Sequence, residues 1–194
     1  RDKDMYPSNC INTEQLNLMN KMRMLWEQHS TWTRAAITSI VFGLPDEGPV
    51  TQRLLRNPDD FGVVLGQFYG EKIASRFDGL LTAHLVIAAE LVRAAKAGEG
   101  KRAADAEKRW YENADEIAAF LGRINPFWTA EGWRIMLYEH LRLVKAIAVE
   151  MLRGNYQESI RATDENEIHV LEMADMMSAG ILMQFPERFH SGSQ

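Results

Sequence analysis

Three histidines have spacings that would place their imidazoles on the buried faces of helices. His29 shares a helical face with Leu25 and Trp32, and His84 and His140 lie in similar positions among apolar residues. Residues three, four and seven positions apart project from one side of an α-helix. Each histidine is also near the middle of its apolar segment. We therefore expect the three imidazoles to lie at one height in a helical bundle.

Two further polar residues are expected at this height. Asn113 lies on an apolar stripe between Trp110 and Ile117. The last helical segment contributes Asp175, and Asp164 lies on the same expected face, closer to the start of that segment. The apolar stripe predicted there consists of Ile160, Ile168, Leu171, Ser178, Ile181 and Leu182.

A buried imidazole or carboxylate must be hydrogen-bonded, paired or bound to a metal ion. Neutral imidazoles with one carboxylate are a common ligand set for Zn, Fe, Mn or Cu. The pattern predicts a metal-binding bundle, either a redox enzyme or a metal carrier, with ligands His29, His84, His140 and Asp175. Around them, Asn113, Asp164 and Trp110 would orient or enclose the ligands. The sequence indicates no particular reaction.

A second group of possible ligands lies on the last helical segment. His169 has Glu165 and Glu172 at helical spacings, a geometry that suits a metal but more often forms a solvated polar patch. We rank this group below the first because His169 lies away from the predicted apolar stripe.

Other functions fit the same residues. The histidines could form a purely structural polar network, and nearby tryptophans could line a cavity for haem or a small organic ligand. Haem ranks below a metal ion, and the chain has no Cys-x-x-Cys-His. The methionine-rich last segment would also suit a non-enzymatic assembly protein or a homo-oligomer. Neither the Glu-x-x-His pairs of di-iron bundles nor a glycine-rich phosphate loop is present.

The elements that must position these residues are all helical. Apolar periodicity predicts an all-α, single-domain antiparallel bundle of about five long helices. A short helical connector, residues 44–70, follows the first helix, and Asn57 is the expected N-cap of its second half. The predicted ranges are an arm at 1–12, helices at 13–42, 71–97, 101–124, 130–153 and 156–185, and a tail at 186–194.

Composition limits the classes of partner. The net charge is −5 and the basic residues are dispersed among acids, which argues against a nucleic-acid binder. No apolar run approaches the roughly 18 residues needed to span a membrane. The first residues lack a signal-peptide pattern, and Cys10 is the single cysteine. We expect a cytoplasmic protein, although the missing initiator Met is compatible with removal of an N-terminal segment.

Three segments resemble an uncharacterised family of small helical proteins from spore-forming bacteria. They are 24–34 (MLWEQHSTWTR), 110–118 (WYENADEIA) and 173–181 (MADMMSAGI), and the resemblance covers most of the chain. Some members carry an acetylglutamate kinase label, which the absence of an α/β pattern and of phosphate-binding glycines contradicts here. The resemblance implies a helical fold and no activity. Some relatives have an acidic residue near the position of Ile147, which implies a reduced ligand set in this chain.

Overall fold

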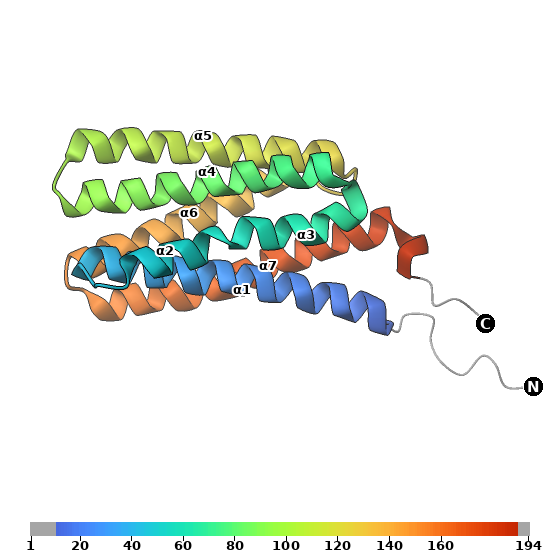
Figure 1. Cartoon of the computed structure of the whole chain (residues 1–194), viewed down its shortest axis with the longest axis horizontal. Coiled ribbons are helices and arrows are strands. Elements are labelled where there is room, and N and C mark those ends of the chain that lie inside the picture. Colours follow the sequence, from blue (N-terminus) through green and yellow to red (C-terminus); the bar gives the residue numbers. More distant parts are fainter. Residues whose placement is uncertain (1–10, 190–194) are drawn as a thin grey trace, which may run out of the picture.

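The computed structural model describes residues 11–189, and this part of the chain is all-α, as predicted (Figure 1). It contains no β-strand within that range. The elements are α1 (Thr13–Phe42), α2 (Glu47–Leu55), α3 (Asn57–Tyr69), α4 (Glu71–Lys96), α5 (Gly100–Ile124), α6 (Ala130–Leu152), α7 (Tyr156–Gln184) and the 3₁₀ turn η1 (Pro186–Phe189). In this range no helix is long and apolar enough to cross a membrane.

Local sequence signals set the ends of the helices. The Asn12 side chain accepts a hydrogen bond from the Gln15 backbone N–H, and the Gln15 side chain accepts one from the Asn12 backbone, which together form a capping box at α1. Helix α1 ends at Gly43, whose φ of 62° favours glycine. The Thr129 side chain caps α6 by accepting from the Gly132 N–H.

The connector after α1 is mostly helical and belongs to the core. Helices α2 and α3 occupy most of it, and Phe61 and Leu65 of α3 are fully buried. Asn57 does not cap α3, because its side chain makes no cap hydrogen bond and points instead to α1. The expected N-cap at Asn57 was therefore wrong, since a buried partner on α1 takes its side chain.

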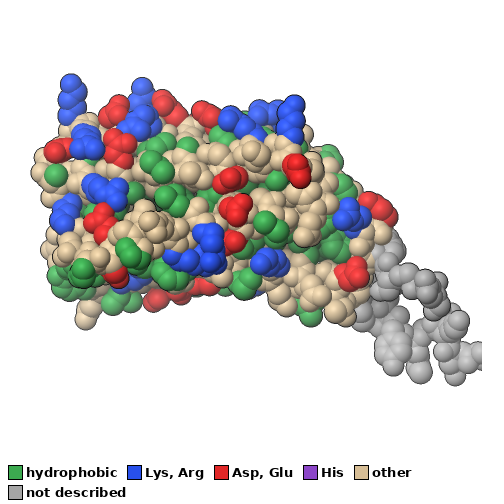
Figure 2. Space-filling model, in the orientation of Figure 1, with side chains coloured by type: hydrophobic (Ala, Val, Ile, Leu, Met, Phe, Trp, Pro, Cys, Tyr) green, Lys and Arg blue, Asp and Glu red, His purple; other side chains and the backbone are tan. Residues whose placement is uncertain are grey.

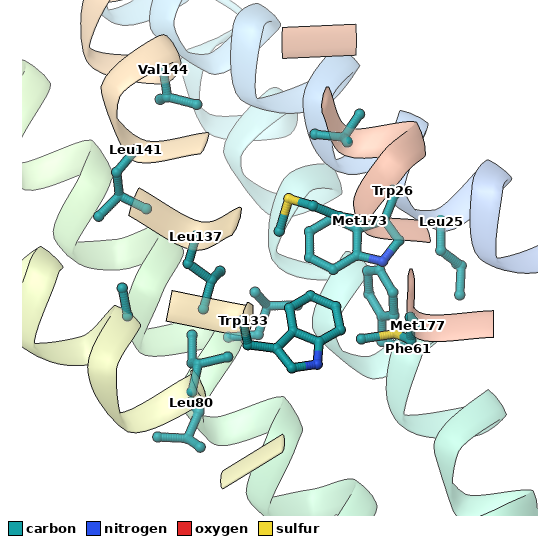
Figure 3. Packing of buried hydrophobic residues seen from close by; sticks show 14 of the residues in the cluster. Leu25, Trp26, Phe61, Leu80, Trp133, Leu137, Leu141, Val144, Met173 and Met177 are labelled. Atoms are coloured by element: carbon teal, nitrogen blue, oxygen red, sulfur yellow. The ribbon is translucent and has the colours of Figure 1, made fainter. Parts of the chain in front are cut away.

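The long helices pack along their lengths. Helix α4 lies between α3 and α5, α6 lies between α5 and α7, and α1 packs on α7 (Figure 1). Figure 3 shows Trp26 of α1 and Trp133 of α6 near Met173 and Met177 of α7 in the core. On the surface, Lys and Arg side chains are interspersed with Asp and Glu, as one face in Figure 2 shows.

The buried face of α7 differs from the sequence prediction. Ile160 and Ile168 are 51% and 63% exposed, whereas Asn166, His169 and Met173 face the interior. Helix α7 carries apolar residues around most of its circumference, so periodicity alone does not select one face. The rotation of α7 about its axis is set by small residues, because they let neighbouring segments approach closely. The small buried residues of α7 include Ala162, Ala174, Ser178 and Gly180.

The two ends of the described chain meet. The Asn12 side chain donates a hydrogen bond to the Phe189 carbonyl, and the buried Phe189 ring stacks on Phe68. The first four residues of the expected tail therefore form η1, and Phe189 among them joins the core. The rest of the tail, and residues 1–10 of the expected arm with Cys10, lie outside the described residues.

Candidate metal centre

The three expected histidines gather in the centre of the bundle. His29, His84 and His140 lie on α1, α4 and α6 and are only 1–2% exposed. The Nε2 atoms of His29 and His140 are 3.3 Å apart, and their ring centres are 5.2 Å apart. The ring centres of His84 and His140 are 6.3 Å apart.

Each histidine has its own asparagine on a neighbouring helix. The Nδ1 atoms of His29, His84 and His140 lie 2.8–3.0 Å from the Oδ1 atoms of Asn57, Asn113 and Asn166 respectively. The asparagines come from α3, α5 and α7, and all three are buried. Three pairs of helices thus each supply one histidine and one asparagine.

Two of the asparagine amides have a fixed orientation. The Nδ2 atoms of Asn57 and Asn113 donate to the carbonyls of Leu25 and Leu80, both 3.0 Å away. A carbonyl can only accept, so the Oδ1 atom of each amide must face the histidine. Each of these carbonyls belongs to the residue four positions before the paired histidine. Hence His29 and His84 donate from Nδ1, and their Nε2 atoms carry no proton in the neutral state.

At His140, two side chains of α7 make the two contacts that a single asparagine makes at each of the other histidines. The carbonyl four residues before His140 belongs to Met136, and His169 Nε2 donates to it at 2.8 Å. Asn166 Nδ2 lies 2.9 Å from Ser30 Oγ, which can either accept or donate. His169 therefore has a structural partner, because it links α7 to the α6 backbone. Its Nδ1 lies 3.6 Å from Glu172.

Burial keeps the central imidazoles neutral. Loss of hydration lowers the pKa of His29 to about 4, against the smaller opposing effect of its hydrogen bond to Asn57. Burial, reinforced by the neighbouring His29, lowers the pKa of His84 to about 3. The pKa of His140 is also held well below its usual value, mainly by burial and then by the other two histidines. Near neutral pH, His29 and His84 thus each present a bare Nε2 lone pair.

The expected carboxylates are not in this layer. Asp175 is half exposed and forms an ion pair with Arg23 at 2.6 Å, and Asp164 is exposed. The placement of both on the buried face of α7 was wrong, because the helix is rotated from the predicted stripe. Trp110 does lie beside the layer, with its ring centre 5.4 Å from that of His84.

The second predicted group is not brought together as a cluster. The side chains of Glu165 and Glu172 are 55% and 63% exposed. Glu165 lies 3.9 Å from Arg142, while His169 turns inward to Met136. The three residues have a helical spacing that suits a metal, but the two glutamates lie on the surface and His169 lies in the interior.

No complete metal cage is preformed. Within residues 11–189, no group of three or more His, Cys, Asp or Glu side chains is arranged to hold a metal ion. The 3.3 Å contact of His29 and His140 is the one close approach of two histidine nitrogens among the described residues. The third ring, His84, is farther out.

Two members of the site escaped sequence reasoning. Asn57 was assigned to a helix end, and Asn166 lies on the face of α7 that the prediction turned outward. A signal for Asn166 exists, because it continues the three- and four-residue spacing of Ala162, Val170 and Met173. For Asn57 we find no signal in the sequence, since its contact with His29 spans a chain reversal.

Comparisons with models of known protein families, with curated proteins and with solved structures give no match for this chain. The resemblance to the family of small helical proteins stays a prediction. The function must therefore be argued from the histidine layer itself.

Proposed function

We propose that this protein binds a transition-metal ion between His29 and His140, with His84 as the third ligand. The observation that carries the proposal is the 3.3 Å separation of the two Nε2 atoms. The amide of Asn57 leaves His29 Nε2 without a proton, and Asn166 Oδ1 facing His140 Nδ1 does the same for His140. Two lone pairs facing one another repel, unless a cation lies between them.

The spacing fits a tetrahedral ion. Nitrogen ligands lie about 2.0–2.1 Å from zinc, so two of them at a tetrahedral angle are about 3.3 Å apart. Rings bound in this way have centres about 5 Å apart. The pair His29–His140 has both values, at 3.3 Å and 5.2 Å. The outer hydrogen bonds to Asn57 and Asn166 also match those that orient metal-binding histidines.

His84 would complete the ligand set by a small movement. Its ring centre is 6.3 Å from that of His140, about 1 Å more than the spacing of two rings on one tetrahedral ion. Asn113 bonds both His84 and the α4 backbone, so the pair would shift together. We expect metal binding to draw α4 toward α1 and α6 at this height.

The ligand set favours some metals over others. Imidazole nitrogens suit Zn, Cu and Fe, whereas Mn prefers oxygen ligands, and Asp175 is not in the layer. Three neutral imidazoles leave the full charge of a divalent ion in a buried site, which is unfavourable. We therefore propose Zn²⁺ with an anionic fourth ligand, and Cu⁺ as the ion whose single charge needs least compensation.

A structural polar network is the second candidate, and Ser30 supports it. If the Asn166 amide is turned over, its Oδ1 accepts from the Ser30 hydroxyl and its Nδ2 donates to His140 Nδ1. His140 then carries its proton on Nε2 and donates it to His29 Nε2. In this arrangement the Ser30 hydroxyl, the Asn166 amide and the His140 imidazole are all hydrogen-bonded without a metal ion.

Metal titration of the purified, untagged protein distinguishes the two. After chelator treatment, we expect one equivalent of Zn²⁺ or Co²⁺ to bind and to raise Tm. The Co²⁺ absorption spectrum should be that of a tetrahedral site. The variants H29Q and H140Q should weaken binding by more than the roughly 10–100-fold that loss of an outer hydrogen bond causes.

The matched control is H169Q, which removes a buried histidine bonded to the Met136 carbonyl. It should bind Co²⁺ like the original protein. Failure to bind any of Zn²⁺, Co²⁺ or Cu⁺, or equal binding by H140Q, would overturn the metal proposal. Nitrogen-15 NMR provides a second readout: the metal proposal expects the Nε2 signals of His29 and His140 to shift when Zn²⁺ is added, whereas the structural network expects the Nε2–H tautomer of His140 to persist.

Self-association through α7 is a separate proposal. Among the methionines that suggested it, Met173 and Met177 are fully buried and serve the core, whereas Met183 is half exposed. Ile160 and Ile168 are exposed on the same helix and are the residues that would contact a second copy.

A further inference from the structure

An apolar cavity lies next to the histidine layer. It has a volume of about 270 Å³ and is bounded by α1, α2, α4, α5 and α6. Thr33, Ala88 and Val144 line it, and they lie four residues after His29, His84 and His140. The cavity is thus one helical turn from the imidazoles on three helices.

Small side chains create this space. The lining includes Ala36, Ala88, Ala89, Ala103 and Ala148, at positions where larger residues would fill a bundle core. Protein interiors are normally packed without voids much larger than a water molecule. A cavity of this size between well-packed helices therefore calls for an occupant. The lining reaches the surface near the α4–α5 turn, where Ala95, Gly100 and Ala104 are exposed.

The size sets the scale of that occupant. An apolar cavity of about 150 Å³ stays dry and binds benzene, which has six heavy atoms. In proportion, 270 Å³ holds about ten heavy atoms. This is below the range of most cofactor sites and much too small for haem.

Trp110 and Thr33 offer a ligand no hydrogen bond. Trp110 Nε1 and Thr33 Oγ1 form none within the described part of the chain, but both atoms are shielded by surrounding protein atoms and are closed to the cavity. The same unpaired indole N–H occurs at Trp26 and Trp133, which do not line the cavity. A polar group placed inside would therefore lose its hydration without gaining a partner.

The charges around the cavity argue against an ionic ligand. Glu107 and Lys145 are its two charged lining residues, and they form an ion pair with each other at 2.5 Å. Lys145 is therefore already neutralised. A carboxylate placed inside would lose its hydration without gaining a counterion.

We propose that this cavity binds a neutral, apolar molecule of about ten heavy atoms, such as a medium-chain hydrocarbon. Its carbon atoms lie against the alanines. Trp110 contacts both this ligand and His84, with 5.4 Å between the two ring centres. Binding does not require the metal.

The test uses the full chain freed of metal and three probes of similar length: 2-nonanone, nonane and nonanoate. Trp110 lines the cavity, so intrinsic fluorescence reports occupancy, and calorimetry gives the stoichiometry. We expect saturable binding of one nonane. 2-Nonanone should bind about five- to tenfold more weakly, because its carbonyl loses hydration without gaining a donor, and nonanoate weakest of all.

Two variants and one control complete the test. A148F fills the cavity and should abolish binding of nonane, whereas A146F adds the same ring on the α6–α7 surface and should preserve it. W110F keeps an apolar wall and should still bind nonane. Calorimetry is the readout for this variant, since it lacks the reporting indole.

The proposal is overturned if nonane does not bind, or if folded A148F binds it as well as the original protein. Tighter binding of 2-nonanone than of nonane would refute the apolar character of the site. The variant H140Q distinguishes this proposal from the metal proposal. It should lose Co²⁺ and keep nonane.

Discussion

The asparagines beside His29 and His84 each perform two tasks with one carboxamide. Oδ1 of Asn57 and of Asn113 fixes the proton of the imidazole on Nδ1, and Nδ2 bonds a backbone carbonyl of the histidine's own helix. A single side chain thus sets a tautomer and holds two helices together. The same groups that would be needed to orient a metal ligand also stabilise the fold.

The variant N57A tests this double role. It leaves His29 Nδ1–H and one Leu25 hydrogen bond without a partner, and we expect a loss of about 1–3 kcal/mol in the free energy of unfolding. His29 can then move its proton to Nε2, so Co²⁺ affinity should fall about 10–100-fold. Urea denaturation and Co²⁺ titration measure the two effects.

The control for this experiment is N17A, which removes an exposed asparagine from α1, the helix that carries His29. It should change neither quantity by more than the roughly 0.5 kcal/mol typical of surface substitutions. If N57A unfolds like N17A and binds Co²⁺ equally well, Asn57 does not control His29.

Among the helices, α7 depends on one close approach. Gly180 lies against Trp128, and a Cβ atom there would be 1.8 Å from Nε1 and 2.5 Å from two ring carbons. The same indole N–H donates to the Met176 carbonyl of α7. The loop before α6 is therefore held against α7 at a position where only glycine fits.

Substitution of this glycine should be strongly destabilising. G180A must displace the buried indole, and we expect it to lower the free energy of unfolding by about 2 kcal/mol or more. G79A is the matched control, because a Cβ at Gly79 on α4 meets nothing within 4 Å. Alanine should raise stability there by about 0.5–1 kcal/mol through helix propensity.

Urea or thermal unfolding checks both variants. A G180A protein as stable as G79A would mean that Trp128 moves away without loss, and that the α6–α7 junction is looser than the structure indicates.

Across the whole molecule, one hydrogen-bond chain joins segments that are distant in sequence. Tyr69 at the end of α3 donates to the Gln184 side chain on α7 and accepts from the Asn125 side chain after α5. Gln184 in turn donates to the Ile124 carbonyl. Burial raises the pKa of Tyr69 to about 12, with a smaller opposing effect of the bond from Asn125.

This network predicts a loss of stability in alkali. The unfolded tyrosine ionises near pH 10 and the folded one near 12, so its contribution is complete below pH 10 and disappears as pH rises to 12. Two pKa units correspond to at most about 2.7 kcal/mol, and partial exposure reduces this to about 1 kcal/mol.

Denaturation at several pH values compares Y69F with Y156F, whose ring is exposed on α7. Y69F should be less stable than the original protein at pH 7, and the difference should shrink between pH 10 and 12. Parallel pH profiles for all three proteins would contradict a role for Tyr69 in this range.

The sequence by itself determined the helices and much of the layer. Glycine, proline and capping residues mark the ends of α1, α4, α5, α6 and α7 to within about two residues of the prediction, because these signals act locally. The 3.6-residue periodicity along the helices also placed His29, His84, His140 and Asn113 inside.

Only the tertiary structure decided what these residues meet. Helix α7 is apolar on most sides, so its rotation depends on how closely small residues such as Gly180 pack. Because of this rotation, Asn166 lies beside the histidines at the place where the sequence predicted Asp175. Asn57 reaches His29 only after the chain has reversed through α2. Hydrogen-bond partners and the 3.3 Å spacing of two nitrogens depend on contacts between distant segments, which periodicity along the chain does not encode.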